Sequence, residues 1–164
     1  MNKAVFIDRD GVINRKGKSY YIFREEEFIF NKGVFEALNY FQSKGYILIV
    51  ITNQGGVAKG IYTVSQLEKL NKMLIDKLAD QGIRITEIFY CPHHPDVSSC
   101  ECRKPGSLLF EKAISKYEID IKRSYMIGDT EVDIEAARKA GIKGFQIPTN
   151  GNMMTEIVEK ELIK

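Results

Sequence analysis

Two aspartates separated by one residue follow directly on a short apolar run near the start of the chain. The run is Ala4–Ile7, and the sequence continues Asp8-Arg9-Asp10-Gly11. If the strand geometry continues, the side chains of Asp8 and Asp10 point to the same side. Two carboxylates so close repel each other unless a cation or a shared proton compensates. Because hard oxygen ligands favour Mg²⁺, the pair is a candidate magnesium site, although Asp-Gly alone is also an ordinary turn.

Polar residues follow two other apolar runs. Thr52-Asn53-Gln54 comes after Ile47–Ile51, and Gly128-Asp129 comes after Tyr125–Ile127. In open α/β sheets, ligands bind at the carboxyl ends of the strands. Three such strand ends therefore predict one site at one edge of a sheet. Asp133 adds charge there, but Thr130-x-x-Asp133 fits a helix cap equally well, and both interpretations stay open.

A second group of chemically capable residues lies in the segment 91–102. It contains all three cysteines of the chain, at 91, 100 and 102, together with His93 and His94. An odd, clustered number of cysteines does not fit a secreted disulfide scaffold. Cys91, His93, Cys100 and Cys102 instead fit a tetrahedral structural Zn²⁺ site, with His94 as an alternative to His93. The loop has little apolar content, so a bound ion would supply ordering free energy that packing cannot.

The elements that must position these residues alternate between strand and helix patterns. Continuous apolar runs predict strands buried on both faces, and helical spacing of apolar residues predicts the segments between them. Ser65-x-x-Glu68 resembles a capping box at the start of one helix. The alternation predicts a parallel sheet covered by helices on both sides. The expected strands are Ala4–Ile7, Ile47–Ile51, Ile85–Tyr90, Tyr125–Ile127 and Phe145–Ile147, and the expected helices are Val34–Lys44, Ser65–Gln81, Leu108–Tyr117 and Glu131–Ala140.

Length and composition limit the number of domains and the classes of partner that the protein can have. The 164 residues predict a single domain over residues 1–164, and 44% hydrophobic residues suffice for a buried core. The formal net charge of +2 gives no reason to expect nucleic acid or a membrane surface as a partner. No apolar run is long enough to cross a bilayer, and the N-terminus does not resemble a signal peptide. We therefore expect a cytoplasmic protein. We also expect a monomer that acts on a small molecule.

Four motifs occur in order along the chain: Asp8-x-Asp10-Gly11, Thr52, Lys104 and Gly128-Asp129-x-x-x-Asp133. By these motifs the chain resembles the haloacid dehalogenase (HAD) phosphatase superfamily over nearly its whole length. The resemblance implies a Rossmann-like α/β fold, with three α/β/α layers around a central parallel sheet. It also implies a phosphoric monoester hydrolase that forms an aspartyl-phosphate intermediate. From Asp8 to Thr52 and from Thr52 to Lys104 the chain is too short for a cap domain, so we expect an open site.

The resemblance also implies a role for each motif residue. Asp8 would be the nucleophile, since a carboxylate is already ionised at neutral pH. Asp10 would protonate the leaving oxygen and later activate water. Thr52 would bind the transferring phosphoryl group, and Lys104 would offset its charge. The implied Mg²⁺ ligands are Asp8, Asp10 through its carbonyl, and Asp129.

The pattern CPHHP…CxCRKP is similar to a zinc-loop branch of this superfamily. That branch contains D-glycero-D-manno-heptose 1,7-bisphosphate phosphatases and histidinol-phosphate phosphatases. By this resemblance, Cys91, His93, Cys100 and Cys102 bind zinc, and Arg103 recognises the part of the substrate away from the reacting phosphoryl group. Further candidates for substrate binding are Asn53, Gln54, Gly55 and Thr130.

The choice of branch rests on small differences. Gly55 stands where heptose enzymes often have serine, and Thr130 where they tend to have a basic residue. The six residues between His93 and Cys100 resemble the shorter loop of histidinol-phosphate phosphatases. We expect hydrolysis of heptose 1,7-bisphosphate to the 1-phosphate, in carbohydrate metabolism, with histidinol phosphate as the alternative substrate. A phospho-acceptor signalling domain is the rival from another class, although Asp10 argues for turnover.

Overall fold

Strands and helices alternate along the chain in the computed structural model, which describes residues 1–18 and 21–162. Residues 19–20 and 163–164 lie outside the described part. The strands are β1 (Ala4–Ile7), β2 (Ile47–Asn53), β3 (Ile85–Cys91), β4 (Tyr125–Gly128) and β5 (Lys143–Gln146). The helices are α1 (Val34–Ser43), α2 (Val64–Ala79), α3 (Leu108–Tyr117), α4 (Glu131–Lys139) and α5 (Met153–Glu159), with short 3₁₀ helices η1 (Glu25–Glu27) and η2 (Ile121–Arg123).

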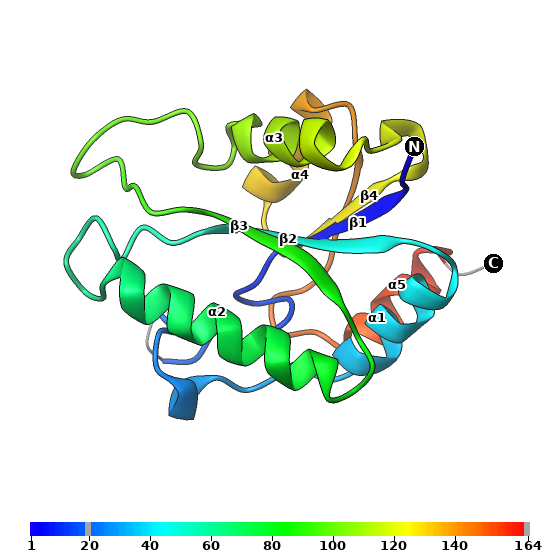
Figure 1. Ribbon diagram of the computed structural model, residues 1–164, viewed down its shortest axis with the longest axis horizontal. Helices are drawn as coiled ribbons and strands as arrows, with labels where there is room; N and C mark the ends of the chain where they lie inside the picture. The colour runs from blue at the N-terminus through cyan, green and yellow to red at the C-terminus, as the bar shows by residue number, and fades with distance from the viewer. Residues whose placement is uncertain (19–20, 163–164) are drawn as a thin grey trace.

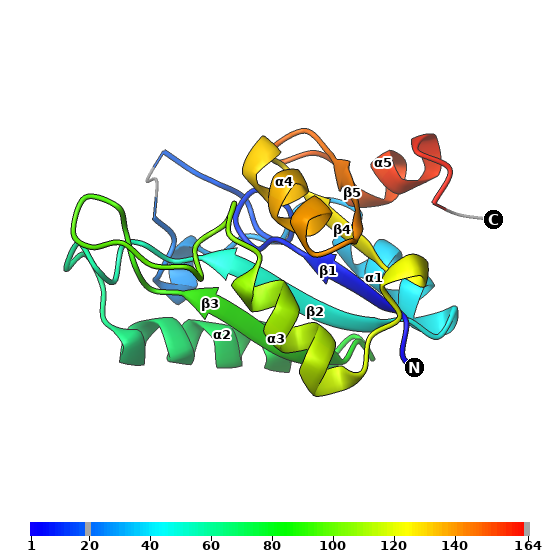
Figure 2. The same cartoon turned by 90° about the horizontal axis from the view of Figure 1, so that it is seen from above.

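The strands form one parallel sheet in the order β3-β2-β1-β4-β5. Helices α1, α2 and α5 cover one face and α3 and α4 cover the other, as Figures 1 and 2 show. This is the three-layer α/β/α arrangement expected from the sequence. Between β1 and β2 the described residues contain only η1 and α1, so they hold no cap domain.

Two separate apolar cores form because strand side chains alternate between faces. On β1, Val5 and Ile7 pack toward α1 and α2, whereas Ala4 and Phe6 pack toward α3 and α4. The centre of each core is fully buried, and Phe6 lies 5.1 Å from Phe110 between ring centroids. Burial on both faces explains why the central strands are continuous apolar runs.

Most of the expected elements differ from the structure by one or two residues at a boundary, and the clearest differences concern the start of α2, β5 and α5. The box at the start of α2 is formed by Thr63 and Gln66, not by the expected Ser65-x-x-Glu68. Thr63 Oγ1 accepts from the Gln66 amide at 3.1 Å, and Gln66 Oε1 accepts from the Thr63 amide at 2.8 Å. The same motif thus occurs two residues earlier. β5 begins at Lys143 instead of Phe145, and α5 was not predicted.

Within residues 1–18 and 21–162, no helix has both the length and the apolar character that crossing a bilayer requires.

Candidate active site and cysteine loop

The carboxyl ends of three neighbouring strands meet at one cleft. β1 lies between β2 and β4, with Ile7 in register with Val50 and Ile127. The amide of Asp8 continues the ladder by donating to the Ile127 carbonyl at 3.1 Å. All four predicted catalytic residues and all five predicted substrate-binding residues line the cleft, which has a volume of about 130 Å³. A larger groove of about 580 Å³ lies between η1 and α2, and none of the predicted site residues lines it.

Asp8 is a buried carboxylate that donors hold from two sides. Its Oδ1 accepts from the Arg9 amide at 2.8 Å and from Lys104 Nζ at 3.0 Å. Burial raises the pKa of Asp8 well above its ordinary value; Asp133, Asp129 and Asp10 add to the rise, and Lys104 opposes it. The position therefore calls for further positive charge if Asp8 is to stay ionised.

Lys104 enters the site from the loop between β3 and α3. Its ammonium contacts Asp8, the Ile51 carbonyl at 2.8 Å and Asp133 Oδ1 at 2.6 Å, and the residue is 3% exposed. Burial lowers the pKa of Lys104, but Asp8 and Asp133 outweigh burial and raise it above the ordinary value. Lys104 is therefore a charged ammonium at neutral pH.

Asn53 holds the backbone of Lys104 in place. Its Nδ2 donates to the Lys104 carbonyl at 3.1 Å, and its Oδ1 accepts from the Lys104 amide at 3.0 Å. Asn53 lines the cleft, and its substrate-binding role stays a prediction. The structure adds a second role, because the two bonds fix the backbone of the residue whose ammonium reaches Asp8.

Three neighbouring side chains hold the carboxylate of Asp10. Oδ1 accepts from Arg9 Nη2 and from Asn14 Nδ2, both at 3.0 Å, and Oδ2 accepts from Gln54 Nε2 at 3.0 Å. The cluster of carboxylates that could share an ion does not include this side chain. The metal contact that the resemblance implies for Asp10 is the one through its carbonyl, and this stays a prediction.

The carboxylates of Asp8, Asp129 and Asp133 form the group that fits a divalent cation, with one oxygen of each within 4.8 Å of the others. Asp129 Oδ1 is buried and has no hydrogen-bond partner in the described structure. A buried oxygen without a partner is expected where a metal ion binds. Asp129 Oδ2 accepts from Thr149 at 2.8 Å and from Lys16 at 3.2 Å. All-oxygen donors of this kind suit Mg²⁺.

Asp133 makes the helix-cap contacts and also lies in the cleft. Its Oδ2 accepts from the amide and the hydroxyl of Thr130, at 3.2 and 3.0 Å, and so caps α4. Its Oδ1 pairs with Lys104. One carboxylate thus starts the helix and positions a cationic side chain of the site.

Gly11 lets the turn after β1 come close to Asp129. Its φ is +88°, and a Cβ there would lie 2.2 Å from Asp129 Oδ2. Its amide closes the turn by donating to the Asn14 carbonyl at 2.7 Å. The Asp-Gly pair is therefore a turn, as the plainer interpretation held, and it also brings the two acidic strand ends together.

The remaining predicted residues form the wall and mouth of the cleft. Thr52 is buried, and its Oγ1 accepts from Gln54 Nε2 at 2.9 Å. Arg103 donates from Nη1 to the His93 carbonyl at 3.1 Å. A Cβ at Gly55 would lie 2.8 Å from Arg103 Nη1 and 2.8 Å from the ring of His94. The absence of a side chain at Gly55 therefore gives Arg103 its place at the mouth.

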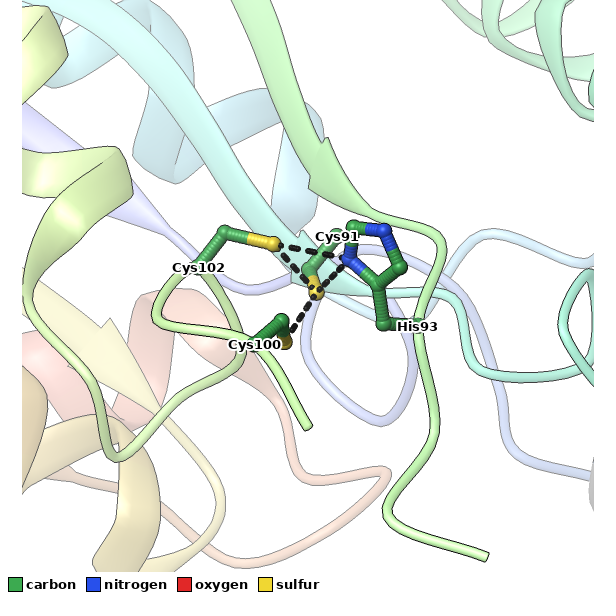
Figure 3. Close-up of side chains that lie close together, drawn as sticks. All are labelled: Cys91, His93, Cys100 and Cys102. Carbon is green, nitrogen blue, oxygen red and sulfur yellow. Dashed lines mark hydrogen bonds between the residues drawn. The ribbon is translucent and has the colours of Figure 1, made fainter. Parts of the chain in front are cut away.

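The cysteine loop forms a compact group of four metal-ligand side chains, Cys91, His93, Cys100 and Cys102 (Figure 3). Cys91 Sγ lies 3.5 Å from His93 Nδ1, 3.6 Å from Cys100 Sγ and 2.7 Å from Cys102 Sγ. Tetrahedral zinc with about 2.3 Å bonds to sulfur needs separations of about 3.8 Å, so the group fits after a shift of about 1 Å at Cys102. His93 is the histidine of the group, because His94 Nδ1 instead accepts from the Asp96 amide.

Burial raises the pKa of the Cys91 thiol, and its contact with Cys102 raises it further. A cation is therefore needed to make this sulfur a thiolate at neutral pH.

Several residues that shape the site were missed by sequence reasoning. Arg9 and Asn14 hold Asp10, Thr149 holds Asp129, and Tyr62 contacts Gln54 with its hydroxyl. Arg9 had a signal, because an arginine inside an otherwise acidic motif has to find an anion. Thr149 and Tyr62 had none, since they come from loops whose path is fixed only by the folded sheet.

Comparisons with known proteins identify the group to which this arrangement is similar. Residues 101–162 match a family model described as HAD-hydrolase-like. The D-glycero-beta-D-manno-heptose-1,7-bisphosphate 7-phosphatase of Haemophilus ducreyi is 38% identical over 165 residues, which cover 97% of this chain and 90% of the relative. The D-glycero-alpha-D-manno-heptose-1,7-bisphosphate 7-phosphatase of Campylobacter jejuni is 41% identical over 140 residues, which cover 85% of this chain and 78% of the relative.

A solved structure has the same fold. The crystal structure of D,D-heptose 1,7-bisphosphate phosphatase from B. bronchiseptica, complexed with magnesium and phosphate, superposes with a TM-score of 0.83 at 29% identity. The match covers 96% of this chain and 86% of that one.

Proposed function

This chain belongs to the family of HAD-like phosphatases, and we propose that it hydrolyses the 7-phosphate of D-glycero-D-manno-heptose 1,7-bisphosphate to leave the 1-phosphate. The observation that carries the proposal is the meeting of Asp8, Asp10, Thr52 and Lys104 in one cleft at the sheet edge. Relatives that align over most of the chain and are named for this reaction support the substrate.

The first step transfers the phosphoryl group to the protein. A carboxylate oxygen of Asp8 bonds to phosphorus while the bond from phosphorus to the sugar oxygen breaks. Asp10 gives a proton to that leaving oxygen, so the product departs as an alcohol. Thr52 donates to the phosphoryl group, and Lys104 offsets its charge.

The second step regenerates the protein. Water attacks phosphorus, Asp10 takes a proton from that water, and the bond from phosphorus to Asp8 breaks to release inorganic phosphate. Asp8, Asp129 and the Asp10 carbonyl would hold Mg²⁺, which when bound neutralises charge on the phosphoryl group. The unpartnered, buried Asp129 Oδ1 supports this assignment.

The direct test is phosphate release from a panel of substrates with and without Mg²⁺. The panel contains both anomers of heptose 1,7-bisphosphate, histidinol phosphate and p-nitrophenyl phosphate. We expect the highest kcat/KM for one heptose anomer. A preference for histidinol phosphate would overturn the proposed substrate. A stably phosphorylated chain without multiple turnover would overturn the proposed hydrolysis.

Gly55→Ser is expected to weaken binding of the bisphosphate. The new side chain would displace the Arg103 guanidinium, which lies 2.8 Å from the position of its Cβ and which we assign to the distal phosphate. KM should rise by about 3- to 10-fold, the worth of one hydrogen bond, with kcat within about twofold. Gly17→Ser is the control, because no atom of the described residues lies within 4 Å of its added Cβ. An unchanged KM would show that Arg103 does not bind the distal phosphate.

We propose that the loop 91–102 carries one structural Zn²⁺ on Cys91, His93, Cys100 and Cys102. The ion would tie the end of β3 to the segment that presents Arg103 and Lys104. Cys100 is exposed, so its replacement removes a ligand without opening a cavity.

Purified wild-type protein should therefore contain one zinc per chain. Cys100→Ala should lower the zinc content and reduce Tm by roughly 5 °C or more. His94→Ala should retain the metal, because His94 lies outside the group. Elemental analysis and thermal melts measure both, and zinc retained by Cys100→Ala but lost from His94→Ala would reverse the assignment.

We also propose a single cytoplasmic domain over residues 1–164 that acts as a monomer on its sugar phosphate. The bacterial relatives named for sugar-phosphate hydrolysis support the setting. Size-exclusion chromatography with light scattering tests the monomer, and a mass near twice 18.7 kDa would overturn it.

A further inference from the structure

The two oxygens of the Asp10 carboxylate have different surroundings. Oδ1 accepts from Arg9 Nη2 and Asn14 Nδ2, whereas among residues 1–18 and 21–162 Oδ2 accepts only from Gln54 Nε2. A carboxylate oxygen has about two lone-pair positions. Oδ1 is therefore saturated, and Oδ2 keeps a position open toward the cleft. The oxygen that is free to carry a transferable proton is the one that Gln54 holds.

The side chain of Gln54 is fixed in one orientation. Gln54 is 2% exposed, and its Nε2 donates to Asp10 and to Thr52 Oγ1. Its Oε1 accepts from the hydroxyl of Tyr62 at 2.5 Å. A flipped amide would turn Oε1 toward the carboxylate of Asp10, acceptor against acceptor. The hydroxyl of Tyr62 therefore selects the orientation in which Gln54 donates to Asp10.

Tyr62 is itself held by its surroundings. Its ring is 3% exposed and stacks on Phe23, with centroids 5.1 Å apart and planes at 13°. Gly56 makes room for it, since a Cβ there would lie 2.1 Å from the ring. Burial raises the pKa of Tyr62, so its hydroxyl remains a donor at neutral pH. The ring position does not depend on the hydroxyl, which allows the two to be separated by mutation.

We propose that Tyr62 and Gln54 are positioning residues for Asp10, and that the chain of hydrogen bonds Tyr62–Gln54–Asp10 aims Oδ2 at the leaving oxygen. The proposal rests on the proposed function, because it assigns Asp10 the proton transfer. It gives Gln54 a role different from the substrate contact that the sequence suggests. The proton moves from Asp10 Oδ2 to the sugar oxygen as its bond to phosphorus breaks, and Gln54 and Tyr62 exchange no proton with the substrate.

The test compares two leaving groups. An alkyl phosphate, such as the heptose bisphosphate, needs a proton on its leaving oxygen, whereas p-nitrophenyl phosphate releases a stable anion. Tyr62→Phe should lower kcat/KM for the sugar phosphate by about 3- to 10-fold and for the aryl phosphate by less than about twofold. Gln54→Leu should show the same selectivity with a loss of about 10- to 100-fold.

A double-mutant cycle tests whether Tyr62 acts through Gln54. Adding Tyr62→Phe to Gln54→Leu should cause no further loss of kcat/KM, since Gln54→Leu has already broken the chain of hydrogen bonds to Asp10. Tyr117→Phe is the matched control, because it removes a hydroxyl bonded to Glu87 away from the cleft. Tm values within about 2 °C of the wild type would show that folding is intact.

Equal losses for both leaving groups, or additive losses in the double variant, would overturn the positioning role. A wild-type protein that cleaves p-nitrophenyl phosphate through Asp8 but not the heptose bisphosphate would overturn only the proposed substrate. The effects of Tyr62→Phe and Gln54→Leu would then be measured with the best alkyl phosphate of the panel.

Discussion

Asp8→Asn is expected to reduce kcat by a factor on the order of 10⁴ or more, because an amide is a very poor nucleophile toward phosphorus. The substitution keeps the shape of the side chain, and its oxygen can still accept from the Arg9 amide and from Lys104. KM should change little, since the phosphate-binding groups remain. Steady-state phosphate release measures the loss.

Rapid acid quench with radiolabelled substrate gives a second measurement for this variant. Wild-type protein should retain label as an acyl phosphate, and Asp8→Asn should retain none. Asp120→Asn is the control, because Asp120 pairs with Arg123 at the start of η2, outside the cleft. Near-normal turnover by Asp8→Asn would end the proposal of an aspartyl-phosphate intermediate.

Lys104→Met is expected to impair both folding and activity. Removal of the ammonium leaves Asp8 and Asp133 buried without their cation, which costs about 3–5 kcal/mol in the free energy of unfolding. The pKa of Lys104 is raised in the folded state, so its stabilisation is fully present below the ordinary lysine pKa. Stabilisation is lost only as the pH rises through the raised value, and the full effect should therefore appear at neutral pH.

Urea denaturation at pH 7 without added Mg²⁺ measures this loss. Lys72→Met is the control, because the Lys72–Asp76 pair is exposed and should contribute less than about 0.5 kcal/mol. Mg²⁺ should restore part of the stability of Lys104→Met by supplying charge to the same carboxylates. A Lys104→Met variant as stable as Lys72→Met would show that the buried pairs are not what holds the site together.

The sequence was most informative where one residue type has one structural consequence. Continuous apolar runs bounded β1, β2 and β4 closely, because a strand buried on both faces tolerates little else. The strand-end rule then brought Asp8, Thr52 and Asp129 to one edge. The resemblance favoured His93 over the adjacent His94, and the path of the loop places His93 with the three cysteines.

What stayed hidden depended on contacts between distant segments. α5 is only seven residues long, too short to be stable alone, and it is held by packing against α1 and by the Asn152 cap. Asn53 ends β2 and Gln54 follows it, and both resemble substrate ligands by position. Whether their amides face ligand or protein depends on Lys104 and Tyr62, which come from other parts of the chain. Residue type therefore predicted well which residues line the cleft. It predicted poorly which of them bind protein groups and which are available to a substrate.

The central place of β1 has a consequence for biosynthesis. β1, which leads into Asp8, is synthesised before the other four strands of the sheet, but its neighbour β4 is more than a hundred residues away in sequence. At about 5–20 residues per second, a nascent chain waits roughly 6–24 s before β4 emerges. Throughout that interval one edge of an entirely apolar strand lacks its partner and is open to aggregation or to a chaperone. A truncated chain ending before Tyr125 should for the same reason be insoluble and without any residual turnover.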